Sequence, residues 1–152
     1  MNAPALTFVA DIFVEVAAPI TIGETQEGLR RLVPILGGRI EGPNLQGEIL
    51  PAGADYQLIR ADGYTTLDAR YAARMAGGAM LYIVNLGVRY GAPELMAKIT
   101  RGEPVPPEQI YFRTTPRFET ADPSLTWLTR PLFLATAIRR PELVEVKVFE
   151  VG

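Results

Sequence analysis

Apolar and polar residues alternate along two long stretches of the chain, residues 6–17 and residues 79–90. Successive side chains of a β-strand point to opposite faces, so a period of two predicts a strand with two unlike faces. Shorter stretches of the same character lie between glycine and proline residues. We expect further strands over residues 29–40, 45–50, 55–60, 65–73, 109–115 with a continuation to 120, 125–129, 132–139 and 143–151.

Glycine and proline residues indicate where these strands stop or bend. Pro19 and Gly23 should end the first strand, because proline lacks a ladder donor and glycine opens turn geometry. Pro34 and the pair Gly37–Gly38 interrupt the second strand, where we expect a bulge. Asp62–Gly63 predicts a short hairpin connection, since both residues tolerate a positive φ.

Residues 93–101 form the clearest helical segment. Pro93 suits a first turn, Glu94 lies near the positive end of the helix dipole, and Gly102 can cap the other end. About nine or ten short strands with one short helix favour an antiparallel barrel or a sandwich. We prefer the closed β-barrel, because its lumen can hold the polar residues that interrupt apolar stretches. These residues are Gln46, Glu48, Asp55, Asp68, Arg70 and Arg113.

Composition narrows the classes of function. A chain of 152 residues fits one domain, 1–152, and a net charge of -2 argues against a nucleic-acid partner, which would need clustered Lys and Arg. The absence of cysteine and histidine excludes Ser-His-Asp triads, Cys-His dyads and His- or Cys-based metal sites. We expect the protein to bind neither a metal nor a cofactor and to have no membrane partner. By default we expect a cytoplasmic location. The sequence leaves open whether the protein forms a homo-oligomer.

Five stretches together resemble a family catalogued as domain of unknown function 3237, also called uncharacterised protein family 0311. They read GLRRLVPILGG at 28–38, EGPNLQGEILPAGADY at 41–56, DGYTTLDARYA at 62–72, YFRTTPRFET at 111–120 and SLTWLTRPLF at 124–133. The resemblance covers most of the chain. It implies a lipocalin-like antiparallel β-barrel and no established activity.

Two aspartates are candidates for acid–base chemistry. Asp55 follows the turn PAGA, so its carboxylate could point into the barrel mouth, or could cap nearby backbone N–H groups in an Asx-type turn. Asp68 and Arg70 are two residues apart and share a strand face with Thr66. If that face is interior, the two must pair or meet a charged ligand, although a purely structural ion pair fits the pattern equally well.

Four further residues are candidates for ligand binding. Tyr111 and Arg113 share a face, and an arginine beside a phenol could clamp a carboxylate or enolate, or could simply bridge strands at the rim. Trp127, the only tryptophan, could form an aromatic wall, although a lone tryptophan is more often part of the core. Glu48 is a further carboxylate candidate, unless it lies on a solvated face.

These observations leave three hypotheses for function. The first is a small-molecule-binding barrel that performs acid–base chemistry of the isomerase, lyase or cyclase type on a small anionic or aromatic ligand. The second is a carrier that binds such a ligand without turnover. The third is a structural module in which the polar rows are ion-pair networks only.

Overall fold

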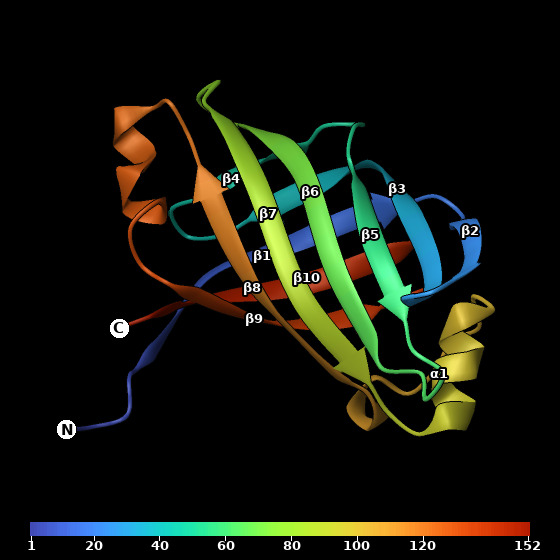
Figure 1. The fold of residues 1–152 in the computed structure, drawn as a ribbon. Helices are drawn as coiled ribbons and strands as arrows, with labels where there is room; N and C mark the ends of the chain where they lie inside the picture. Colours follow the sequence, from blue (N-terminus) through green and yellow to red (C-terminus); the bar gives the residue numbers. More distant parts are fainter.

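The structure, a computed structural model, describes residues 1–152 and forms a closed antiparallel β-barrel (Figure 1). Its strands are β1 (Leu6–Val16), β2 (Ile20–Thr25), β3 (Gly28–Glu41), β4 (Gln46–Ile49), β5 (Ala54–Ile59), β6 (Thr65–Met75), β7 (Met80–Tyr90), β8 (Tyr111–Glu119), β9 (Phe133–Arg139) and β10 (Leu143–Val151). β1 closes the barrel by pairing with β10 on one side and β3 on the other. β4 and β5 both lie between β3 and β6, so the wall has eight strand positions. The predicted barrel is confirmed.

The short helix is also where the sequence predicts it. α1 (Pro93–Thr100) has Pro93 in its first turn and ends one residue before the predicted boundary. Gly102, with a φ of 78°, donates its backbone N–H to the carbonyl of Ile99, as expected for a glycine that caps a helix C-terminus. Two short 3₁₀ helices, η1 (Pro107–Gln109) and η2 (Pro123–Leu128), complete the structure.

One local prediction is wrong, and one strand is absent from the predicted set. Residues 125–128 belong to η2 and not to a strand, and Thr129 follows as its C-cap, because Asp122 accepts a hydrogen bond from the Ser124 N–H at 2.8 Å and Pro123 opens the first turn. An aspartate cap followed by proline is a helix start, and it outweighs the apolar character of the residues that follow. The strand β2 was not predicted, since Pro19 and Gly23 suggest an end of regular structure. β2 instead pairs with the first part of β3, with a register shift around Gly23.

The bulge expected near Gly37–Gly38 is present in β3. The pairing with β1 changes register between Gly37 and Ile35, so Leu36 has no direct partner. Gly38 has a φ of 136°, and a Cβ atom there would lie 1.9 Å from the carbonyl oxygen of Phe13. Only glycine allows the two strands to approach this closely, and this approach closes the barrel.

The lumen has an apolar end and a polar end. Phe118 and Phe133 pack edge to face near η2, with ring centroids 5.2 Å apart. The large aliphatic side chains that are at most 1% exposed are Ile12, Ile40, Leu81, Ile83, Leu128 and Val148. Buried polar side chains come from the other ends of the strands, Arg31 at the start of β3 and Arg89 at the end of β7.

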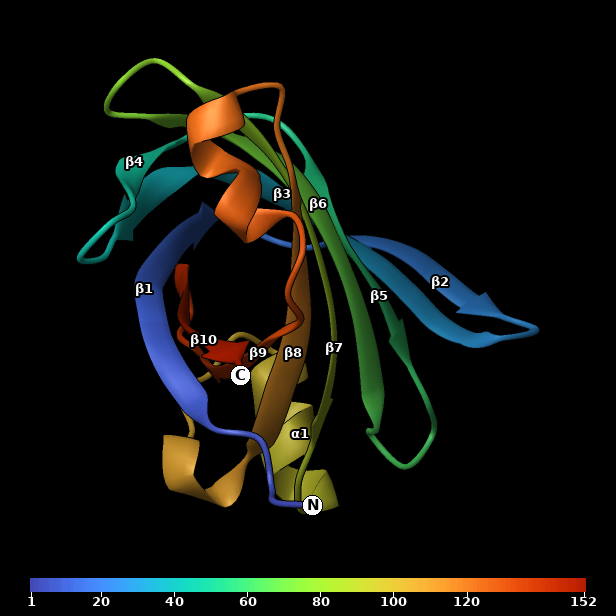
Figure 2. The same ribbon diagram turned by 90° about the vertical axis from the view of Figure 1, so that its left-hand side faces the viewer.

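Each end of the barrel is covered by a helical segment, η2 at one end and α1 at the other (Figure 2). Leu128 of η2 belongs to the apolar core, and Met96 and Ile99 of α1 are buried. α1 is therefore the cover of the polar end. No helix in the chain has both the length and the apolar character needed to cross a membrane.

Replacing Gly38 with alanine should strongly destabilise the barrel. The new Cβ would meet the Phe13 carbonyl, and the positive φ is unfavourable for alanine. We expect the free energy of unfolding to fall by at least about 2 kcal/mol, measured by denaturant titration. The control is Gly77→Ala in the β6–β7 turn, where nothing lies within 4 Å of the new Cβ. Equal stability of the two variants would contradict the role of Gly38 in closure.

Candidate functional site

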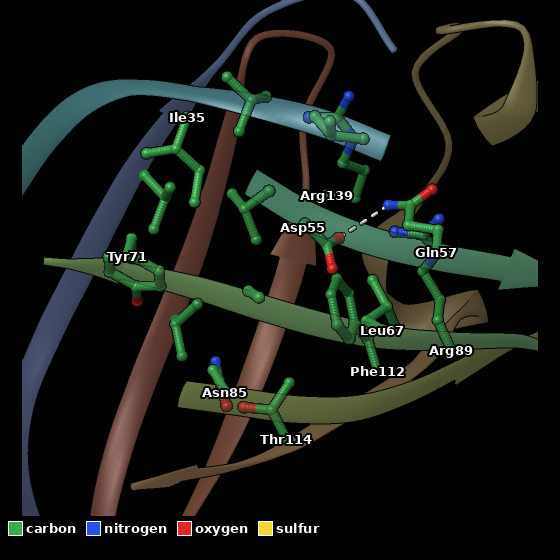
Figure 3. A pocket seen from close by; sticks show the side chains of 16 residues that line it. Ile35, Asp55, Gln57, Leu67, Tyr71, Asn85, Arg89, Phe112, Thr114 and Arg139 are labelled. Atoms are coloured by element: carbon green, nitrogen blue, oxygen red, sulfur yellow. Dashed lines mark hydrogen bonds between the residues drawn. The ribbon is translucent and has the colours of Figure 1, made fainter. Parts of the chain in front are cut away.

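A cavity of about 50 Å³ lies inside the barrel, between its apolar core and α1. Its wall is mostly apolar, but Asp55, Gln57 and Arg89 gather on one side of it (Figure 3). The lining residues are Val14, Val16, Val33, Ile35, Asp55, Gln57, Leu67, Ala69, Tyr71, Asn85, Arg89, Phe112, Thr114, Arg139, Val144 and Val146.

The cluster of polar side chains in the lumen results from the alternation of side chains along each strand. Asp55 and Gln57 are two residues apart on β5, and Arg89 and Arg139 lie near the ends of β7 and β9. In each strand the inward positions are those two residues apart, so all four side chains face the lumen. Figure 3 shows Asp55, Gln57 and Arg89 on one side of the pocket, with Tyr71 on the opposite side.

Asp55 is the only carboxylate that lines the cavity. Its two oxygens accept hydrogen bonds from Gln57 Nε2 at 2.9 Å and from the Asp68 backbone N–H at 3.1 Å. Burial raises the pKa of Asp55, because it disfavours the charged form. The two hydrogen bonds and the charges of Arg89 and Arg139 oppose this rise without cancelling it.

The two arginines of the lumen have donors without a protein partner. Arg89 is 3% exposed, and neither its Nε nor its Nη1 has a hydrogen-bond partner. Nη1 of Arg139 is likewise buried and unpartnered. Burial lowers the pKa of Arg89 to about 10 and also lowers the pKa of Arg139. Arg89 therefore stays charged at neutral pH, and its donors need an acceptor.

Arg31 connects the polar end of the lumen to the helix that covers it. Its Nη1 donates to the carbonyl oxygen of Thr100 at 2.8 Å. Thr100 is the last residue of α1, and the carboxyl end of a helix carries partial negative charge. The Arg31 guanidinium is therefore partly compensated by α1, although its Nε has no partner.

Three other polar groups of the wall add hydrogen-bonding capacity. Asn85 Oδ1, Thr114 Oγ1 and Gln57 Oε1 are buried and without a partner. The Tyr71 hydroxyl lies at the opposite side of the cavity, and burial together with the charge of Asp55 raises its pKa. Tyr71 therefore stays protonated and is available as a hydrogen-bond donor.

A surface groove of about 720 Å³ adjoins the cavity. It lies between the end of α1, the β1–β2 connection and the β9–β10 turn, with Thr100, Pro19 and Pro141 among its residues. Val16 and Arg139 line both the cavity and the groove. Arg139, which is partly exposed, therefore stands at the mouth of the lumen.

The prediction that Asp68 and Arg70 face the lumen is wrong. They form an ion pair of 3.0 Å on the outer surface, with side chains 38% and 52% exposed. The apolar row between them, which includes Leu67 and Tyr71, faces the cavity instead. A strand face that is mostly polar is favourable in water, whereas the alternating apolar row gains by burial.

Tyr111 and Arg113 are also on the outer face of the barrel, contrary to the prediction that Arg113 faces the interior. Arg113 lies over the Tyr111 ring at 5.0 Å, and Tyr111 stacks on Tyr90 with ring centroids 4.7 Å apart. Trp127 lies on η2 and is 36% exposed. None of the predicted site residues other than Asp55 lines the cavity.

Glu48 has a similarly external position on β4. It pairs with Arg74 at 3.1 Å, and its side chain is 62% exposed. The polar residues that drew attention in the sequence thus form exposed ion pairs and cation–aromatic contacts across neighbouring strands.

Sequence reasoning missed the residues that accompany Asp55 in the lumen, namely Arg31, Gln57, Tyr71, Asn85, Arg89, Thr114 and Arg139. A signal for some of them was present. Asn85 and Arg89 share the β7 face that begins with Leu81 and Ile83, and Arg139 shares the face of Ala135 and Ala137. A polar residue that continues an apolar row is a better indicator of a lumen position than a row that is polar throughout.

Comparison with known proteins gives the chain a family. The family model described as "Protein of unknown function (DUF3237)" matches residues 4–151. A UPF0311 protein of Rhodopseudomonas palustris is 43% identical over 144 residues, which cover 95% of this chain and 94% of the relative.

Solved structures support the same relationship. A conserved protein of unknown function from Rhodopseudomonas palustris aligns over 100% of both chains with a TM-score of 0.95 and 40% identity. A β-barrel-like protein from Acinetobacter baumannii has a TM-score of 0.88 and 32% identity, covering 100% of this chain and 98% of the other. A structure described as an enzyme from Penicillium herquei shares the fold at 17% identity, with a TM-score of 0.75 over 100% of this chain and 97% of the other. The chain therefore belongs to the DUF3237 family of proteins of unknown function.

Proposed function

We propose that the barrel binds a small organic anion in its lumen and that Asp55 exchanges a proton with it. The observation that carries this proposal is the set of buried guanidinium donors without a protein partner, on Arg89 and Arg139, around a single carboxylate. Water can satisfy hydrogen-bond donors, but it adds no charge to oppose that of the arginines. An anionic ligand supplies both the hydrogen-bond acceptors and the opposing negative charge.

The arginines are the groups that would hold the anion. A guanidinium offers several donors in a planar fork that matches a carboxylate or an enolate oxygen. In a cavity of this kind such contacts are stronger than in water, because the surrounding apolar side chains keep the local dielectric constant low. Thr114 and Asn85 add oxygen acceptors for any N–H or O–H group of the ligand.

Asp55 is the group suited to move a proton. As a base it would take a proton from a carbon beside a ligand carbonyl, and the electron pair of that C–H bond would pass to the carbonyl oxygen. The resulting enolate would be stabilised by the arginine donors, and return of the proton to either carbon or oxygen completes the exchange without any redox change. The raised pKa of Asp55 brings it closer to neutral pH and thus favours this role.

Asp55 should titrate above its ordinary pKa of 3.8 in the folded protein. The folded state then holds this proton more tightly than the unfolded state. The contribution of Asp55 to stability is present in full below pH 3.8 and is lost as the pH rises through the raised pKa. Carbon NMR of labelled aspartate carboxyl groups measures the pKa, and Asp55→Asn identifies the resonance. A value at or below 3.8 would contradict the role of burial.

Arg139→Gln should weaken the binding of short-chain carboxylates such as butanoate by at least about tenfold, because one charged hydrogen bond is lost. Isothermal titration calorimetry measures the affinity. The matched control is Arg113→Met on the outer face, which should leave the affinity unchanged. An equal loss in both variants would show that the arginines act through stability and not through contact with the ligand.

Hydrogens beside the carbonyl of small oxo carboxylates should exchange with deuterium from the solvent in the presence of the protein. Proton NMR in heavy water follows the exchange. Asp55→Asn should slow it by about 10²–10⁴-fold while the variant still binds carboxylates. If the wild-type protein binds these compounds and catalyses no exchange, the barrel is a carrier and Asp55 has only a binding role.

A further inference from the structure

The charges around the cavity can be counted. Arg89 and Arg139 contribute two positive charges to its wall, and Asp55 contributes one negative charge. No other charged side chain lines the cavity. With all three groups ionised, the wall therefore carries a net charge of one positive unit, from two arginines and one aspartate.

This count covers the wall of the cavity alone. Arg31 lies beside the cavity and lines the adjoining groove, and its charge is partly compensated because its guanidinium donates to the Thr100 carbonyl at the negative end of α1. Glu15 and Glu142 line the adjoining groove, and both are exposed to solvent, where water and salt screen them. Arg101, also in the groove, pairs with Glu103.

The rest of the wall is mostly apolar. Its apolar side chains include Val33, Ile35, Leu67 and Val146. A hydrocarbon-lined cavity of about 150 Å³ accepts benzene. The cavity here, at about 50 Å³, is a third of that size and suits only a short aliphatic group. A second charged group of the ligand would lose its hydration and would find no further opposite charge in the wall.

We infer that the ligand of this lumen is a monoanion with a short apolar body, whose anionic group lies between Arg89 and Arg139 and whose body faces the apolar side chains of the wall. This inference rests on the proposed function. A monoanion brings the net charge of the occupied wall to zero. A dianion leaves one negative charge buried, and a neutral ligand leaves the excess positive charge unopposed.

Three probes of the same chain length test the inference in the wild-type protein: butanoate, succinate and butanamide. Calorimetry should show that butanoate binds at least about tenfold more tightly than either of the others. This comparison requires no variant, so it stands even if a substitution in the lumen prevents folding.

A change of one charge provides the second test. Asp55→Asn raises the net charge of the wall by one positive unit, so the affinity ratio of succinate to butanoate should increase by about tenfold. The control Glu48→Gln removes the same charge from the outer face of β4 and should leave the ratio unchanged. An unchanged ratio in Asp55→Asn, or an equal increase in the control, would overturn the charge count.

The outcomes separate this inference from the proposed function. If succinate binds the wild-type protein as well as butanoate does, or better, the lumen still binds anions and only the monoanion inference fails. If butanamide binds as well as butanoate, or if none of the three probes binds, anion recognition itself fails and the proposed function fails with it.

Discussion

The burial of two arginines beside one aspartate is the constraint on which the polar end of this barrel depends. Arg89 is almost fully enclosed, yet two of its nitrogen donors have no protein partner. A charge in such a position costs several kcal/mol unless it is opposed, and Asp55 can oppose only one of the two. The structure thus accepts a local cost in stability at a place where a ligand could remove it, and this is typical of binding sites.

Apolar packing at the opposite end of the barrel offsets the free-energy cost of burying these charges. Near η2 the lumen is filled by close-packed side chains such as Ile83, Leu128 and Val148, and Phe118 packs against Phe133. Such packing positions the long strands of the barrel, and β5 is held between two of them, β3 and β6. The lumen donors are therefore carried by rigid strands, and only α1 and the neighbouring connections border the mouth. The Arg31–Thr100 hydrogen bond links that cover to β3.

Most of the polar rows that are conspicuous in the sequence lie on the outer surface of the barrel. Asp68 with Arg70 and Glu48 with Arg74 form exposed ion pairs, which contribute little to stability in water. Arg113 extends over Tyr111 on the same kind of surface. These contacts keep the barrel wall hydrated and ordered, but they lie on the other side of the sheet from the cavity and cannot reach a ligand in it.

The sequence by itself determined the local structure of the chain, because strand alternation, helix caps and glycine turns depend on residues close together in the sequence. The long strands, the helix from Pro93 and the bulge near Gly38 follow from such signals, and so does the barrel class. Where two local signals competed, as at residues 123–128, the aspartate cap and proline prevailed over the apolar run.

Which residues of different strands meet inside the lumen was decided only by closure of the barrel. The alternation along β6 already favours burial of the Leu67 row over the Asp68 row, but the residues opposite that row are set only when β1 pairs with β3 and β10. The site is assembled from β5, β7 and β9, which meet only across the lumen. Asp55 could be identified as a candidate because it follows a turn. Arg89 and Arg139 became its neighbours through tertiary structure alone, because the sequence around each arginine contains no information about the residues on the opposite wall.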